Sequence, residues 1–163
     1  MQYYEETPAV TTLTYAPWPR RLASAAIDLL VIAAISAPFL GSTLNKAFEN
    51  TSDVSKANLT SGDLRTLTIV SILIQVTYFT GMHAWRGSTI GKMAARTLVV
   101  RDDGSPLTPQ VAFTRAVALV GINFVSGFAF AIPAVVNMLR TIWSPRHQTW
   151  HDQIAKTVVV NRT

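Results

Sequence analysis

The stretch LASAAIDLLVIAAISAPFL, residues 22–40, decides the class of fold. Its only charged residue is Asp28, and Arg21 stands directly before the stretch. An α-helix needs roughly 20 apolar residues to cross about 30 Å of hydrocarbon, and helices of soluble cores are rarely apolar on every face. The stretch therefore predicts a membrane-spanning helix over residues 21–41.

Two more runs of the same kind follow, at Leu67–Trp85 and Ala116–Leu139. Of the 163 residues 49% are hydrophobic and 14% are charged, whereas soluble domains carry about a quarter charged residues. This deficit of charge leaves too little polar sequence for a soluble domain. We predict a single all-α integral membrane domain, with three apolar helical segments and a small cytoplasmic juxtamembrane platform.

Charge sets the expected orientation of these segments. Lys and Arg prefer the cytoplasmic ends of spans, and both the start of the first span and the segment after the second are rich in them. The N-terminus is then cytoplasmic. The expected order is a polar tail (1–20), a first span (21–41), an outer loop (42–65), a second span (66–85), a basic cytoplasmic loop (86–115), a third span or hairpin (116–143) and a C-terminal tail (144–163).

The third run leaves two arrangements open. A single tilted crossing puts the C-terminus outside, whereas the cations of the tail, such as Arg140 and Arg146, favour the cytoplasm. A hairpin resolves this conflict, with its turn at Ser126-Gly127 and with Pro133 in the returning limb. Such a hairpin is too short for two full crossings, so it would be re-entrant or strongly tilted.

The basic loop and the tail contain the signals for the platform. Thr89–Arg96 is a candidate short interfacial helix, and Asp103-Gly104 is a turn signal. The β-branched runs Thr97–Val100 and Thr157–Val160 predict two strands. These strands can pair as a small sheet only if both lie on the same side of the membrane.

Other classes of protein have little support. The net charge of +5 comes from cations at the ends of apolar runs, so we expect lipid contact and no nucleic acid. The absence of cysteine excludes thiol catalysis and disulfides. His147 and His151 are four residues apart, but Gln148 stands where a metalloprotease helix needs glutamate. We expect no metal, no cofactor and no enzymatic activity.

Asp28 is the most informative single residue. A carboxylate inside a membrane span costs several kcal/mol unless it is paired or hydrated, so it should face other helices. Arg21 precedes it by two helical turns, on the same face, and is a candidate partner. Asp28 is either a buried latch that fixes helix packing or an ion or proton site. The latch is the favoured interpretation.

Three ordered motifs then give the chain a resemblance to the RDD family of small bacterial integral membrane proteins. They are Arg21-Leu22-Ala23 with Ile27-Asp28-Leu29; Gly87 to Lys92 with Arg96, Val99-Val100, Asp103-Gly104 and Arg115; and Arg146 to Asp152 with Ala155 and Thr157. The arginine and two aspartates of the family name correspond to Arg21, Asp28 and Asp152. We expect Asp152 to accept from Arg21, Arg96 or Arg115 and so to fasten the tail to the helices. Gly91, Lys92, Arg96, Arg115 and His151 are supporting residues of the same motifs.

The resemblance implies a multi-pass protein of the bacterial plasma membrane and supplies no substrate. Three short helices are too few to enclose a pathway alone, and the alanine-rich face of the first span suits close helix contact. We therefore expect a structural, assembly or interaction subunit that contacts lipid and other membrane subunits or a second copy of itself. The alternative is an oligomeric cation- or proton-coupled transporter that uses Asp28.

Overall fold

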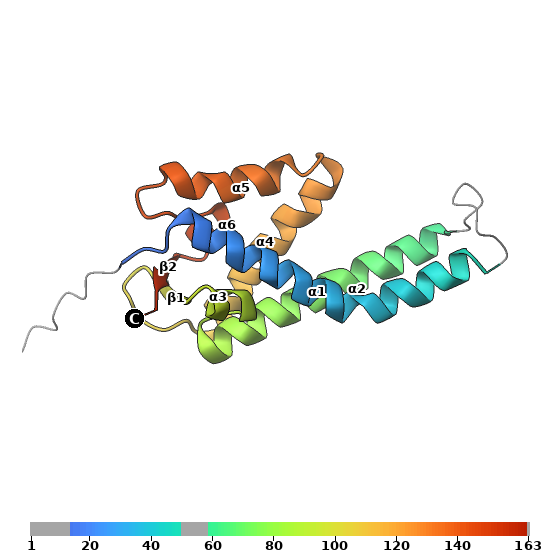
Figure 1. Cartoon of the computed structure of the whole chain (residues 1–163), viewed down its shortest axis with the longest axis horizontal. Coiled ribbons are helices and arrows are strands. Elements are labelled where there is room, and N and C mark those ends of the chain that lie inside the picture. The colour runs from blue at the N-terminus through green and yellow to red at the C-terminus, as the bar shows by residue number, and fades with distance from the viewer. Residues whose placement is uncertain (1–13, 50–58, 163) are drawn as a thin grey trace, which may run out of the picture.

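The computed structural model describes residues 14–49 and 59–162, and the helices account for most of them (Figure 1). The rest of the predicted tail (1–13) and outer loop (50–58), and Thr163, lie outside the described residues. The elements are α1 (Trp18–Ala47), α2 (Ser61–Arg86), α3 (Ile90–Ala94), β1 (Thr97–Arg101), α4 (Pro109–Phe128), α5 (Ile132–Trp143), α6 (Trp150–Ile154) and β2 (Thr157–Asn161).

In this part of the chain, the helices long and apolar enough to cross a membrane are α1, α2 and α4. Their large apolar side chains are mostly exposed, while the buried set includes many polar residues. An apolar exterior around a polar interior is expected of a helical protein in lipid. The prediction of an all-α membrane fold is confirmed at this level.

The first two helices are longer than the predicted spans. We expected the first span to end by residue 41, but α1 continues through Pro38 to Ala47. Its 30 residues correspond to about 45 Å at 1.5 Å per residue. At the start of α2 the Thr60 side chain accepts from the backbone N–H of Asp63, and Asp63 bonds back to Thr60. This capping box begins the helix before residue 66.

The third apolar run is bent. α4 and α5 are joined at residues 129–131, so both ends of the pair lie toward the sheet (Figure 1). The turn expected at Ser126-Gly127 is wrong, because both residues are helical and the chain reverses only after Phe128. The backbone N–H of Ala131 donates to the carbonyl of Ser126, and Pro133 then stands in the first turn of α5, where no N–H is needed.

A two-stranded antiparallel sheet forms where the sequence predicts two strands. β1 pairs with β2 in a register that places Val99 opposite Val159. Val99 and Val159 pack with Leu107 and Ala112 at the start of α4. The sheet therefore anchors the ends of the helices, and the N-terminal ends of α1 and α4 meet there (Figure 1).

The chain repeats one order of elements. A long helix, a second helix, a five-residue helix and a strand occur as α1-α2-α3-β1 and again as α4-α5-α6-β2. The packing repeats as well, since α3 contacts α1 while α6 contacts α4, and α2 contacts α4 while α5 contacts α1. We call these two units the first half and the second half.

Hydrogen bonds match between the halves at an offset of 60 residues. Thr97 Oγ1 donates to the carbonyl of Lys92 (3.2 Å), and Thr157 Oγ1 donates to that of Asp152 (3.3 Å). Arg96 and Lys156, one in each half, both have left-handed backbones, with φ of 52° and 51°. Because Val99 lies opposite Val159, a pseudo-twofold axis passes through that pair of residues. Lys92 and Asp152 are thus equivalent positions.

Candidate functional site

Asp28 lies in the first half and is held by donors from α2 and from the start of α3. Its Oδ1 accepts from the Tyr78 hydroxyl of α2 (2.7 Å) and from the backbone N–H of Gly91 in α3 (2.8 Å). Its Oδ2 accepts from Thr89 Oγ1 (2.6 Å), and Lys92 Nζ lies 3.8 Å away. Only 3% of Asp28 is exposed. These bonds tie α1 to α2 and α3 and satisfy the buried carboxylate.

Gly91 permits this contact because it has no side chain. A Cβ built on Gly91 would lie 2.0 Å from the Ser24 carbonyl oxygen and 2.9 Å from Asp28 Cγ. No real Cβ fits at such distances, so any other residue would push α3 away from α1. Glycine therefore brings the N–H of residue 91 within reach of the carboxylate.

Asp152 forms the second carboxylate site, and its donors come mainly from two arginines. Arg21 Nη1 of α1 donates to Oδ2 (2.8 Å). Arg115 of α4 donates through Nε (3.2 Å) and Nη2 to Oδ1. The Thr149 backbone N–H also donates to Oδ2 (3.1 Å), as part of the capping box that starts α6. Asp152 is fully buried. Although burial opposes its ionised form, Arg115 and Arg21 hold the pKa of Asp152 well below its ordinary value.

Arg115 extends this network to α2. Its Nη1 lies 2.9 Å from Nε2 of His83, while Nδ1 of the same ring lies 2.7 Å from the Phe79 carbonyl oxygen. A carbonyl oxygen can only accept, so Nδ1 carries the proton and Nε2 accepts from Arg115. The neutral His83 thus uses both ring nitrogens, and Arg115 joins α2, α4 and α6.

His151 is a second neutral histidine beside Asp152. Burial, opposed by Asp152 and reinforced by Arg115, lowers the pKa of His151 to about 3. Its Nδ1 lies 3.2 Å from Asn137 Nδ2, and the Asn137 oxygen accepts from the Trp150 backbone N–H (2.8 Å). In the first half, Tyr78 has the role that Asn137 has here: its hydroxyl oxygen accepts from the backbone N–H of Ile90 at the start of α3 (3.2 Å).

Lys92 occupies the position in the first half that Asp152 occupies in the second half. Burial and the charge of Arg115, opposed by Asp28, lower the pKa of Lys92 to about 8. Its side chain is only 13% exposed, and 3.8 Å to Asp28 Oδ2 exceeds a hydrogen-bond distance. Lys92 is therefore a buried cation with a weaker partner than either arginine has.

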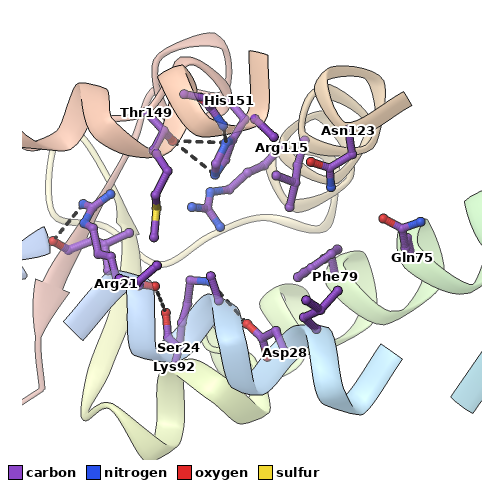
Figure 2. Close-up of a pocket in the computed structure, with 18 of the residues that line it drawn as sticks. Arg21, Ser24, Asp28, Gln75, Phe79, Lys92, Arg115, Asn123, Thr149 and His151 are labelled. Atoms are coloured by element: carbon purple, nitrogen blue, oxygen red, sulfur yellow. Dashed lines mark hydrogen bonds and ion pairs between the residues drawn. The ribbon is translucent and has the colours of Figure 1, made fainter. Parts of the chain in front are cut away.

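A cavity of about 440 Å³ connects the two carboxylate sites. Arg21, Lys92 and Arg115 approach it from different elements, with Asp28 on the α1 side and Gln75 and Asn123 at one end (Figure 2). Its remaining wall is largely apolar. It is formed by Leu22, Ala25, Leu29 and Ile32 of α1, Phe79 of α2, Leu119 of α4, Ala134 and Met138 of α5, and Val159 of β2.

Most of the site residues expected from sequence therefore gather around one cavity. Gly91 and Asp152 do not line it but bond to residues that do, Gly91 to Asp28 and Asp152 to Arg21 and Arg115. Arg96 lies apart, since its side chain is exposed and its carbonyl oxygen accepts from the Arg162 N–H (2.8 Å). The suggested pairing of Arg21 with Asp28 is wrong, because Arg21 bonds to Asp152. The i, i+4 spacing of His147 and His151 is also not helical, since His147 precedes α6 and has φ of 50°.

Several site residues had no assigned role in the sequence, although some carried a readable signal. Thr149-x-x-Asp152 is a capping-box pattern, which predicts that Asp152 bonds back to the start of a helix. Thr89 likewise caps α3, since its hydroxyl oxygen accepts from the Lys92 N–H. The pairing of Arg115 with His83 has no such signal, because it depends on how α2 and α4 pack.

The sequence model described as the RDD family matches residues 15–156, which include both carboxylate sites. No curated protein matches the chain, and no solved structure does.

Proposed function

Since this chain belongs to the RDD family, we propose that it is a structural, assembly or interaction subunit of a larger membrane complex. In this proposal it is not an enzyme, and its charged family residues hold the helices in place. The supporting observation is that Asp28 and Asp152 each accept several hydrogen bonds from inside the chain. A carboxylate so fully occupied has little capacity left for a transported cation.

The distal part of α1 supplies a face for a partner helix. Beyond Asp28 the only fully buried residue of α1 is Ala47. Ala33, Ala37 and Gly41 are spaced four apart on one side; both alanines are exposed, and a Cβ added at Gly41 would meet nothing within 4 Å. Small residues at this spacing allow two helices to approach closely in lipid.

We further propose that the end of the molecule formed by α3, β1, α6 and β2 lies at the cytoplasmic face of the bacterial plasma membrane. Cations are dense there, in the segments around Arg20 and Arg86, and the positive-inside rule places such segments in the cytoplasm. The bent α4–α5 pair returns to the same end (Figure 1). The N-terminus is then cytoplasmic, as is the sheet.

Isolation in mild detergent at native expression level tests the subunit role. We expect a stoichiometric larger membrane protein to co-purify with the wild type. Ala37→Phe should release that partner, because the ring prevents close approach, while leaving the unfolding temperature unchanged. Ile35→Phe is the matched control, since Ile35 is exposed on the other side of α1. A preparation that contains only copies of this chain would contradict the proposal.

The cavity favours a second candidate, an oligomeric cation- or proton-coupled transporter. Asp28 and Lys92 both line it, and such an acid–base pair is able to exchange a proton. Reconstituted vesicles test this alternative. Proton-linked cation flux in the wild type that is lost in a folded Asp28→Asn variant would establish transport. Equal flux at the background level in both proteins would exclude the transporter.

A further inference from the structure

The cavity between the two halves carries an excess of positive charge. Arg21, Lys92 and Arg115 line it, and the carboxylates in contact with them are Asp28 and Asp152. Three cations against two anions leave one positive charge when Lys92 is ionised. The nearby histidines do not add charge, because His83 accepts from Arg115 and His151 has its pKa lowered to about 3. A buried unbalanced charge is costly unless an anion neutralises it.

Lys92 is the cation with the weakest partner. Asp152, at the equivalent position of the second half, has two guanidinium groups as partners. Asp28, the nearest anion to Lys92, already accepts three short hydrogen bonds and lies 3.8 Å from Nζ. The cavity thus holds an ammonium group that its own acceptors do not satisfy.

The other walls suit a hydrocarbon chain. Leu29 and Ile32 of α1 and Ala134 and Met138 of α5 all line the cavity. Leu22 and Leu29 also remain 48% and 67% exposed on the outer surface of α1. The cavity therefore continues into the apolar surface that faces lipid, and an occupant can enter from there.

We propose that this cavity binds an anionic membrane lipid, with its phosphate against Lys92 and its acyl chain leaving past Leu29. The phosphate supplies the missing negative charge and accepts from the ammonium group. The acyl chain packs against the apolar wall. This inference goes beyond the subunit role and does not depend on it, because it concerns only the cavity inside one copy of the protein.

Native mass spectrometry of the full chain in detergent tests the proposal, with thermal unfolding as a second readout. Phosphatidylglycerol should remain bound and raise the unfolding temperature, whereas phosphatidylcholine of the same chain length should do neither. Lys92→Gln should weaken phosphatidylglycerol binding at least about tenfold, the usual size for loss of a charge-assisted hydrogen bond. Lys156→Gln is the matched control, because Lys156 is exposed at the same end of the molecule.

Ala134→Phe provides a variant that keeps every charge. Its ring fills the space beside Met138, so it should abolish lipid binding without removing Lys92, even if Lys92→Gln fails to fold. Equal binding of both lipids, or unchanged phosphatidylglycerol affinity in both cavity variants, would overturn the proposal. Inorganic phosphate that stabilises the wild type as strongly as phosphatidylglycerol would overturn the lipid as the source of the anion.

Discussion

Lys92 and Asp152 occupy equivalent positions in the two halves, yet the sites around them differ. In the second half the carboxylate of Asp152 is the centre, and two arginines and a backbone N–H close around it. In the first half the carboxylate comes from α1, as Asp28, and is held by two hydroxyl groups and a backbone N–H. Lys92 contributes only a distant charge.

This difference assigns separate tasks to the two halves. The site of Asp152 depends on two guanidinium charges that pair with no other carboxylate in the described residues, so loss of its anion leaves two buried cations. The site of Asp28 depends on neutral donors that tolerate a neutral acceptor better. The first half is also where the cavity keeps an unsatisfied cation. We infer that the second half locks the fold, while the first half has room to bind.

The largest effect should come from Asp152→Asn. An amide cannot balance Arg21 and Arg115, and breaking a buried ion pair by removing one partner costs about 3–5 kcal/mol. Equilibrium unfolding in mixed micelles should show this loss of stability. Asp103→Asn, at an exposed turn, should change stability little. A loss below about 1 kcal/mol in Asp152→Asn would mean that the arginines find another anion.

Gly91→Ala should have the next largest effect, about 2 kcal/mol or more, since overpacking of this kind forces the backbone to shift. The added methyl group would lie 2.0 Å from the Ser24 carbonyl oxygen. Gly121→Ala is the control, because nothing lies within 4 Å of a Cβ built there. That change within helix α4 should be neutral or stabilising. Equal unfolding temperatures for the two variants would contradict the close contact of α3 with α1.

Asp28→Asn should destabilise the protein by about 1–2 kcal/mol, less than Asp152→Asn. The amide oxygen can still accept, but the amide nitrogen would face a donor such as Thr89 Oγ1. The same unfolding measurement compares the two variants directly. Asp102→Asn, on a partly exposed side chain, is the control. If Asp28→Asn costs as much as Asp152→Asn, the two sites do not differ as we infer.

The smallest effect, taken per pH unit, is a pH dependence of stability carried by Lys92. Burial lowers its folded-state pKa to about 8, while the unfolded chain keeps an ordinary value near 10.5. Between these values the unfolded state binds more protons, so the stability of the lipid-free wild type should rise with pH, by about 1 kcal/mol per unit. Lys92→Met should lack that rise. A bound anion would raise the folded-state pKa of Lys92 and so narrow the pH range over which stability rises. Parallel stability–pH profiles for the wild type and Lys92→Met would contradict a buried charge on Lys92.

Much of the fold could be predicted from sequence because hydropathy and turn chemistry act locally. The apolar run of α1 and the β-branched strands gave correct elements. The α4 start at Pro109 was missed, although Thr108-Pro109 is a readable helix-start signal, and this placed Arg115 in a loop. Arg21 and Arg115 are two of the three arginines expected as donors to Asp152, but the sequence could not show that both bond to it, nor that Arg21 pairs with Asp152 and not with Asp28.

The repeat itself was present in the sequence as Thr89…Thr97 and Thr149…Thr157, each followed by a valine-rich strand. It was not recognised, because the long helices before these segments share little sequence. The short helices carry different side chains at the decisive positions, Gly91-Lys92 against His151-Asp152. Only the matched hydrogen bonds make the equivalence plain.

The bond between Arg21 and Asp152 spans 131 residues of chain. During synthesis α1 is complete long before residues 149–152 have been made. Arg21, and later Arg115, therefore lie near the membrane without their anion. The nascent protein is consequently incomplete in charge as well as in shape until α6 is synthesised. A chain truncated before Asp152 would keep its apolar helices and still expose this defect, which gives membrane proteases a basis for removing unfinished copies.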